Sequence, residues 1–393
     1  MPIKQRFYLP LKIQELIKKS SSLQNSQLKI EDLSSIIKDK CGLCSFDKEL
    51  ELIEITAKKI LKSFNKAIII SIGGSMSASR AFTACKNYTS ENFKLIYSDS
   101  LSLEKQNEVF SRSNLKNAAI IIISRSGGSV ETTLQTSIVI DKYYKYFGKN
   151  YSLGKHFFVI TKGENSLRKI AVEIGANILE YVSTGGKFSA LSMVGLLPAR
   201  LIGLCPQEII RGAKSKLANY EDALEAALIN YHLLNQGYSI NVLSHYNDLF
   251  DQILARYMQI SSEIIAKEGK GFSTIIARGV FDQHGLWQLF LSGPNDKYFT
   301  FLCNKEDFQN TDSKALIENT YHKLNLKRLK EKQVAVREII IEKIDSYNLG
   351  ALSMHLLLEM MILANFLDIP STTQPDIDRS KKILGKIYAM HKK

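Results

Sequence analysis

The chain has 393 residues, of which 45% are hydrophobic and 23% charged, and its formal net charge is +13. This length is too great for one ordinary core and predicts two domains, while the composition excludes a disordered protein. The lysines are scattered, without a dense basic block or a recognisable nucleic-acid module. We therefore expect no nucleic-acid partner, although a positive field would help to collect an anionic substrate.

Neither the apolar segments nor the cysteines predict an exported or membrane-bound protein. Residues 1–6 lack the apolar core of a secretion signal, and the apolar residues 349–369 include His355 and Glu359, which is typical of a buried helix. Five cysteines do not make a disulfide framework, and Cys41 and Cys44 lack a second pair to complete a metal site. We expect a cytoplasmic protein with reduced thiols, no metal and no membrane partner.

The first half of the chain predicts a parallel sheet. Residues 1–63 have apolar positions at helical spacing and predict an N-terminal helical cap. An apolar run at residues 67–72 then ends in Gly73, Gly74 and Ser75, as a buried strand ends in its exit loop. Further strands are predicted at residues 117–123, 157–161 and 178–182. Strands that alternate with helices predict helices on both faces of a parallel sheet.

The alternation starts again after a helix at residues 191–204. Strands are predicted at residues 239–243, 273–277, 298–302 and 338–342, with helices at 249–267 and 349–367. We therefore predict an α/β protein with two flavodoxin-like domains, residues 64–206 and 207–393, after the cap of residues 1–63. Ligands of such sheets bind at the carboxyl ends of the strands.

The loop of residues 124–129 is a candidate phosphate site on physical grounds. It places Ser124, Arg125, Ser126 and Ser129 with two glycines between a strand and the start of a helix. Free backbone amides and the helix dipole favour an anion there, although a serine-capped turn without a ligand would have the same sequence. No Gly-x-Gly-x-x-Gly turn follows the first strand, and no Gly-Lys-Ser/Thr loop occurs. We expect neither a nicotinamide nor ATP, and no other cofactor.

Two further segments resemble one enzyme family. Residues 185–189 read Gly-Gly-Lys-Phe-Ser, in which a glycine pair lets the backbone approach a ligand closely, and residues 374–381 read Gln-Pro-Asp-Ile-Asp-Arg-Ser-Lys. Together they resemble the glucose-6-phosphate isomerase family, whose first segment reads Gly-Gly-Arg-(Phe/Tyr)-Ser. The resemblance extends in order over roughly residues 68–382, and it implies two sugar-isomerase (SIS) domains.

The resemblance implies reversible conversion of glucose 6-phosphate and fructose 6-phosphate through an enediol, in glycolysis and gluconeogenesis. It also implies a group of residues that bind the substrate or its phosphate: Gly74, Ser75, Ser124, Arg125, Ser126, Ser129, Gly186 and Gln374. The 124–129 loop is similar to the loop that holds the phosphate in sugar-isomerase domains. A metal ion has no part in the implied reaction.

Such an isomerase needs a base that reaches both carbons, a group that opens the sugar ring, and positive charge near the oxyanion. By resemblance the base is Glu263, with Glu268 as a rival in the same segment. His284 and Lys381 match the groups that open the ring, and Lys187 matches the arginine that stabilises the enediolate. In this family the histidine comes from the neighbouring subunit, which implies a homodimer.

Several positions depart from the family pattern. Lys187 keeps the charge of the family's arginine but lacks its planar fork of donors, and Ile264 and Ala266 replace a serine and a glycine. Two alternatives therefore stay open: a sugar-phosphate-binding protein without catalysis, and an isomerase that also accepts mannose 6-phosphate. A transcriptional regulator is less favoured, because the sequence has no recognisable helix-turn-helix segment.

Overall fold

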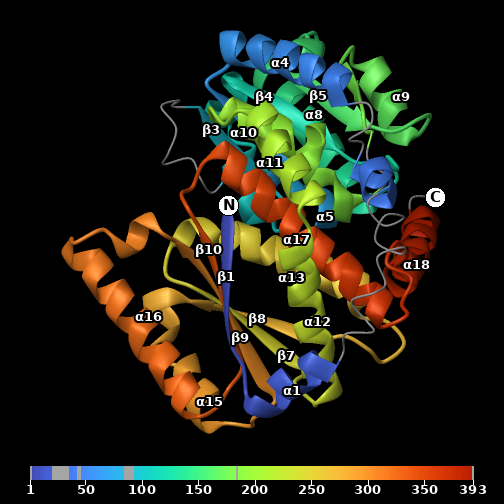
Figure 1. Ribbon diagram of the computed structural model, residues 1–393. Helices are drawn as coiled ribbons and strands as arrows, with labels where there is room; N and C mark the ends of the chain where they lie inside the picture. The colour runs from blue at the N-terminus through green and yellow to red at the C-terminus, as the bar shows by residue number, and fades with distance from the viewer. Residues whose placement is uncertain (1, 20–34, 42–45, 84–92, 183–184, 392–393) are drawn as a thin grey trace. The chain divides into compact units, whose positions relative to one another are not determined.

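The computed structural model describes residues 2–19, 35–41, 46–83, 93–182 and 185–391, and the chain divides into two compact units (Figure 1). The parallel unit comprises Lys38–Pro206 and Gln374–Lys393, and the mixed unit comprises Met1–Ile37 and Gln207–Thr373. Each unit contains one five-stranded sheet. The α/β class predicted from the alternation of strands and helices is confirmed.

All strands of the sheet in the parallel unit run parallel, in the order β3-β2-β4-β5-β6. They are β2 (Lys66–Ile70), β3 (Lys94–Ser98), β4 (Ala118–Ile123), β5 (Phe157–Thr161) and β6 (Asn177–Glu180). In chain order this is the flavodoxin-like 2-1-3-4-5. The order reverses between β2 and β4, and a ligand crevice is expected at the carboxyl ends of these two strands.

Helices surround this sheet: α4 (Phe46–Ser63), α5 (Gly73–Arg80), α6 (Leu103–Val109), α7 (Arg112–Lys116), α8 (Val130–Phe147), α9 (Ser166–Glu173), α10 (Met193–Leu201) and α18 (Pro375–His391). Ile120 and Ile122 of β4 share one core with Val139 and Tyr143 of α8. Ile121 between them is also fully buried and points to the other face of the sheet. β4 reads Ala-Ala-Ile-Ile-Ile-Ile without alternation because both of its faces are covered.

The sheet of the mixed unit has the order β1-β10-β9-β7-β8. Its strands are β1 (Ile3–Tyr8), β7 (Ile240–His245), β8 (Ser273–Arg278), β9 (Lys297–Asn304) and β10 (Val336–Ile341). The last four are parallel and repeat the order 2-1-3-4, whereas β1 pairs antiparallel with β10 (Figure 1). The N-terminal strand thus completes the sheet at the position of a fifth strand.

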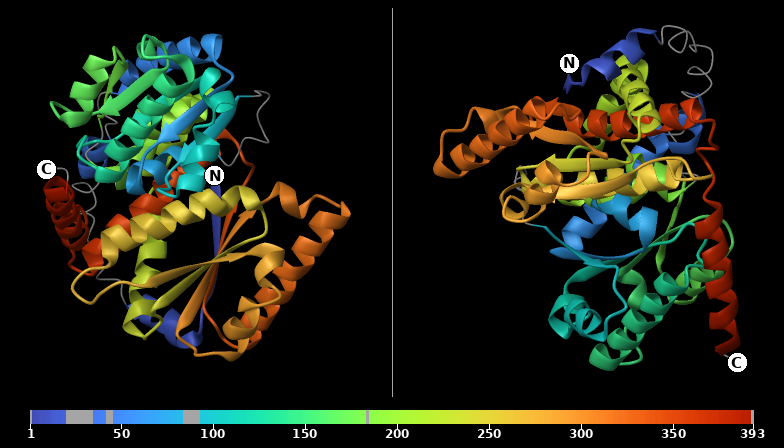
Figure 2. Two further views of the ribbon diagram at one scale, coloured as in Figure 1. Left: turned by 180° about the vertical axis from the view of Figure 1, so that it is seen from behind. Right: turned by 90° about the horizontal axis from the view of Figure 1, so that it is seen from below.

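The helices of the mixed unit are α1 (Leu11–Lys19), α11 (Pro206–Ala218), α12 (Glu221–Asn235), α13 (Asp251–Ile265), α14 (Gly279–Asp282), α15 (Leu286–Ser292), α16 (Ser313–Glu331) and α17 (Ser346–Phe366). Arg337 of β10 bonds to Glu359 of α17, while the next residue, Glu338, bonds to His322 of α16. Successive strand residues point to opposite faces, so α16 and α17 cover opposite faces of this sheet (Figure 2).

The N-terminal segment differs from the predicted helical cap. β1 is a strand, α1 contacts α12 within the mixed unit, and α4 belongs to the parallel unit. The prediction of a helical cap followed the helical pattern of α4. The strand β1 was missed because an edge strand, paired on one side only, has a weak alternation of apolar and polar residues. The same reason explains the unpredicted edge strand β3, of which only Ser98 is fully buried. Residues 374–393, expected in the second domain, lie in the parallel unit.

The apolar helix α17 is long enough to cross a membrane, but 83% of its most apolar stretch of 18 residues is buried. It packs against α12 and α13, and its His355 and Glu359 are fully buried. The prediction of a buried core helix is therefore confirmed. Cys41 is buried, and Cys44 lies outside the described residues.

Candidate functional site

Two glycine segments that are more than 100 residues apart meet at the carboxyl end of β2. The first begins α5, where Gly73 has a φ of +58°, and the second begins the 3-10 helix η3 (Gly186–Leu191). A Cβ added to Gly186 would lie 2.7 Å from Gly74 Cα, and one added to Gly74 would lie 2.8 Å from Gly186 Cα. Side chains do not fit at such distances, so this close contact of two backbones requires glycine at both positions.

Polar side chains lie beside this contact. Ser75 Oγ is 3.1 Å from the hydroxyl of Tyr181, a fully buried residue directly after β6. Lys187, one residue after Gly186, is 4% exposed, and its Nζ lies 5.8 Å from the centre of the Phe188 ring. A buried ammonium group is shielded from water, and its attraction for a nearby anion is stronger than at the surface. The sequence had not indicated Tyr181, because a single tyrosine after a strand carries no recognisable signal.

The loop of residues 124–129 follows β4, the neighbour of β2, and leads into α8. Ser71 Oγ donates to Ile123 O at 3.0 Å, which joins the exits of the two strands. Within the loop Ser124 Oγ donates to Ser129 Oγ at 3.5 Å, and Gly128 N donates to Ser126 Oγ at 3.3 Å. Ser129 precedes α8 without capping it through its side chain, so the helix directs its first amides and its dipole toward the loop.

Gln374 and Lys381 lie in the same unit as this loop. Gln374 precedes α18 and donates through Nε2 to Asp378 Oδ1 at 3.4 Å, and Lys381 is exposed on α18. α18 contacts α8, the helix that begins at the loop. The parallel unit therefore contains all the residues predicted to bind the substrate or its phosphate, together with two of the four predicted catalytic residues.

Glu263 lies in the last turn of α13 in the mixed unit, and it accepts a hydrogen bond from Gln259 Nε2 at 2.9 Å. It is half-buried, and the apolar face predicted for this helix is buried: Ile253, Tyr257, Ile260 and Ile264. The rival Glu268 is exposed in the following loop, where its φ is +55° and Lys270 lies 3.9 Å away. Burial lowers the pKa of the nearby Lys267, and the charges of Glu263 and Glu268 oppose that shift.

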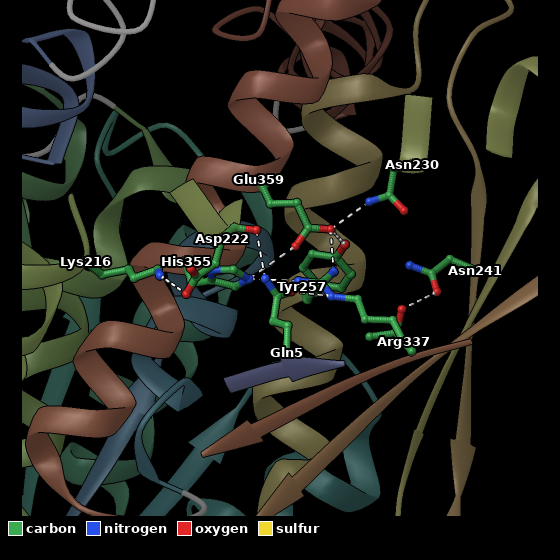
Figure 3. Close-up of polar contacts among 10 residues, drawn as sticks. Gln5, Lys216, Asp222, Asn230, Asn241, Tyr257, Arg337, His355 and Glu359 are labelled. Carbon is green, nitrogen blue, oxygen red and sulfur yellow. Dashed lines mark hydrogen bonds and ion pairs between the residues drawn. The ribbon is translucent and has the colours of Figure 1, made fainter. Parts of the chain in front are cut away.

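A buried polar network fixes the position of α13 (Figure 3). Glu359 Oε1 accepts hydrogen bonds from Tyr257 of α13 at 2.8 Å, Arg337 of β10 at 2.8 Å and Asn230 of α12 at 2.7 Å. Arg337 also donates to Gln5 of β1 at 2.6 Å. One carboxylate thus joins three helices and, through Arg337, two strands, and removal of either charge would leave the other buried and unpaired.

His284 is exposed between α14 and α15, shortly after β8 ends. Arg278 holds this turn from both sides: its backbone N donates to Asp282 Oδ2 at 2.6 Å, and its Nε donates to Asp251 Oδ1 at 3.1 Å. The turn that presents His284 is therefore fastened to the end of β8 and to the start of α13.

The mixed unit does not bring Glu263 and His284 together. Glu263 is at the end of α13, which leads into the start of β8, whereas His284 follows the end of β8. β8 has six residues, which is about 17 Å from first to last residue. The two side chains consequently lie at opposite ends of the sheet. Sequence order alone had not indicated this separation.

Cys303, His322 and Glu338 are the residues of the described chain most similar to a metal site. They are buried, and their potential ligand atoms lie within 4.8 Å of one another. However, His322 Nε2 is 2.9 Å from Glu338 Oε1, and the Tyr8 hydroxyl donates to Glu338 Oε2 at 3.1 Å. His322 Nδ1 has no partner among the described residues, whereas a metal-bound histidine usually donates its second N–H. A histidine–glutamate pair accounts for this cluster.

Comparison with known proteins relates this chain to one family. The phosphoglucose isomerase family model matches residues 50–268, more than half of the chain. A probable glucose-6-phosphate isomerase from Methanococcus maripaludis is 30% identical over 86% of this chain and 81% of its own length. A glucose-6-phosphate isomerase from Carboxydothermus hydrogenoformans is 28% identical with the same coverage.

Solved structures share the fold. A hypothetical protein from Thermus thermophilus matches 98% of this chain and 100% of its own, with a TM-score of 0.80 and 20% identity. A glucose-6-phosphate isomerase from Chlamydia trachomatis matches 88% of this chain and 74% of its own, with a TM-score of 0.75 and 17% identity. With the sequence matches, these findings place the chain by descent as well as by fold. The chain belongs to the phosphoglucose isomerase family.

Proposed function

We propose that the chain catalyses the reversible isomerisation of glucose 6-phosphate and fructose 6-phosphate through an enediol. The observation that carries this proposal is the backbone contact of Gly74 with Gly186, which brings the buried Lys187 next to the turn that follows β2. A crevice at this point of a doubly wound sheet, next to a serine-rich loop at a helix N-terminus, suits a phosphorylated ligand.

We assign the parts of the reaction as follows. Ser124, Ser126, Ser129 and Arg125 bind the phosphate, and the backbone at Gly74, Ser75 and Gly186 lies along the sugar. Lys187 stabilises the developing oxyanion, a role that a charge in a water-poor site performs well. Glu263 moves the proton between the two carbons, and His284 with Lys381 opens the ring, with Gln374 as a further contact.

The positions of Glu263 and His284 support a homodimer in which His284 acts in the partner's site. The two side chains lie at opposite ends of one sheet, so one copy of the mixed unit does not supply both to a single sugar. A two-fold dimer can supply both side chains to each sugar, because each copy gives its histidine to the other and receives one in return. The cytoplasm, where sugar phosphates are metabolised, is the compartment that we propose.

The activity is tested with purified protein and fructose 6-phosphate, by following glucose 6-phosphate formation through a coupled dehydrogenase. We expect turnover in the wild type, a loss of about 10³-fold or more in Glu263→Gln, and wild-type turnover in Glu268→Gln. A wild-type rate of turnover in Glu263→Gln would show that Glu263 is not the base. Binding of fructose 6-phosphate without turnover by the wild type would instead support a binding protein that has lost catalysis. Turnover of mannose 6-phosphate, measured beside it, tests the broader isomerase.

The dimer is tested by mixing two inactive variants, Glu263→Gln and His284→Ala, after joint unfolding and refolding. In a heterodimer one site receives an intact Glu263 and an intact His284, so random pairing restores about a quarter of wild-type activity. If each chain used its own histidine, no site in the mixture would be complete and activity would stay at the level of the single variants. That second result would exclude donation across the interface.

A further inference from the structure

Glu49 is a buried acid whose position the proposed reaction does not explain. It lies in the first turn of α4 and is 5% exposed. Its Oε1 accepts a hydrogen bond from Met193 N at 2.7 Å, the first residue of α10. Its other oxygen, Oε2, is buried without a hydrogen-bond partner among the described residues. An acid that is only half satisfied by hydrogen bonds is costly to bury, which calls for a reason.

The structure around Glu49 fixes α10 at both ends. Glu49 binds the first amide of α10, and five residues later Glu54 pairs with Arg200 in the last turn, at 3.0 Å. At the helix N-terminus the acid also interacts favourably with the helix dipole. Burial is the larger effect, and it raises the pKa of Glu49 from 4.5 to about 7. Among the described residues, the hydrogen bond from Met193 N is the one contact that opposes this shift.

A short chain of hydrogen bonds connects α10 to the glycine contact. Ser192, the residue before α10, donates through its hydroxyl to Ser189 O at 2.9 Å, and Ser189 donates in turn to Gly186 O at 2.8 Å. The 3-10 helix η3 and α10 are tightly packed against each other, because a Cβ added to Gly195 of α10 would lie 2.1 Å from Ala190 O of η3. A displacement at Met193 would therefore be transmitted to Gly186 and to Lys187 next to it.

We propose that Glu49 is a positioning residue: its buried carboxyl group fixes the start of α10, and the Ser192–Ser189–Gly186 chain thereby holds Lys187 beside the Gly73–Ser75 turn. The role assigned to Lys187 rests on the proposed isomerase function, whereas the mechanical link from Glu49 to Gly186 does not. Glu49 itself does not touch the substrate in this proposal.

Three variants test the link. Glu49→Ala removes the acceptor, Glu49→Gln retains a carbonyl oxygen for Met193 N, and Glu51→Gln is the control, an exposed glutamate of the same helix. We expect Glu49→Ala to lower kcat about tenfold to a hundredfold, the usual cost of a small misplacement of catalytic groups. Its KM should stay within about twofold, since the phosphate loop belongs to another segment. Glu49→Gln should keep kcat within about threefold of the wild type, and the control Glu51→Gln should have the kcat of the wild type.

Hydrogen exchange of the amides in residues 186–195 separates the positioning role from the function. We expect faster exchange there in Glu49→Ala than in the wild type, with exchange in α8 unchanged. If the wild type has no isomerase activity but this local effect occurs, the function fails and the positioning role stands. Unchanged exchange and an unchanged kcat in a folded Glu49→Ala would overturn the proposal. A kcat that the glutamine variant does not restore would overturn it as well.

Discussion

The two sheets share one strand order but differ at the point where that order reverses. In the parallel unit, the loops after β2 and β4 are rich in glycine and serine, and the buried Lys187 follows Gly186, which contacts Gly74 of the first loop. In the mixed unit, the loops after β7 and β9 are joined by a side-chain bond, from Asn247 Nδ2 to Asp307 Oδ2 at 2.9 Å. Asp307 also accepts from Asn304 at 3.1 Å. The crevice expected at the first of these points suits an anion, whereas at the second a carboxylate occupies the corresponding loop and disfavours a phosphate.

This difference indicates that the strand order supplies a place for a ligand and that loop chemistry decides whether one binds. The mixed unit uses charge for a different purpose. Its Arg337–Glu359 pair and the surrounding polar groups fasten α12, α13 and α17 to the sheet (Figure 3). The unit thereby gives Glu263 a rigid helix, while the parallel unit contains the residues that we propose to bind the sugar phosphate.

Among the changes that test the comparison of the two sheets, the largest effect should come from the buried lysine. We expect Lys187→Met to lower kcat about 10²–10³-fold with little change in KM, the usual cost of losing one oxyanion-stabilising group. The matched change is Lys305→Met, which alters a half-exposed lysine after β9 that pairs with Glu342 at 2.7 Å. Steady-state kinetics on fructose 6-phosphate measure both variants. Equal losses would mean that the two crevices do not differ as described.

A methyl group at the glycine contact should have the next largest effect. Gly186→Ala forces Gly74 and Gly186 apart, because the new Cβ would lie 2.7 Å from Gly74 Cα, and we expect kcat to fall about 10²-fold. In α18, Gly385→Ala serves as control, since a Cβ there has no neighbour within 4 Å. Circular dichroism and kinetics together distinguish a local displacement from unfolding. Full activity in Gly186→Ala would contradict the requirement for a close approach.

Single hydroxyl groups of the 124–129 loop should matter less. If Ser126 binds the phosphate as we propose, Ser126→Ala removes one hydrogen bond to a charged group, and we expect KM for fructose 6-phosphate to rise about tenfold while kcat changes little. The counterpart in the mixed unit, Asp307→Asn, removes a negative charge without adding a phosphate site, so KM should not change. A lower KM in Asp307→Asn would show that the second crevice also takes part in binding.

The last prediction concerns stability and its pH dependence. Because folding raises the pKa of Glu49 from 4.5 to about 7, the folded protein holds this proton more tightly than the unfolded chain. The resulting stabilisation is complete below pH 4.5 and is lost as the pH rises through about 7. It amounts to at most about 3 kcal/mol. In urea unfolding, the unfolding free energy of Glu49→Gln minus that of the wild type should therefore increase from pH 5 to pH 8.5.

The difference between the wild type and Glu49→Gln isolates the contribution of Glu49 to the pH dependence of stability. Burial lowers the pKa of His156 and of His245, so both destabilise the folded protein in acid, but they do so equally in the wild type and in the variant. A difference in unfolding free energy that stays constant from pH 5 to pH 8.5 would mean that Glu49 does not titrate in this range.

The sequence allowed prediction of most of the fold because buried parallel strands are apolar along their whole length. The strand predicted at residues 157–161 coincides with β5, and the one at 117–123 differs from β4 by a single residue. β1 and β3 were missed because edge strands are half exposed and show little pattern. The family motifs predicted the site residues, and their roles in binding and catalysis stay predictions.

By itself the sequence determined the local features of this protein: apolar strands, glycine turns, a serine-rich loop and the family to which they belong. Only the tertiary structure decided which of these features meet. Chain order does not indicate that Gly74 touches Gly186, that Glu49 binds the start of α10, or that Glu263 and His284 lie at opposite ends of one sheet. Such contacts depend on strand order and helix packing, which are set by the burial of many residues together and not by any one segment.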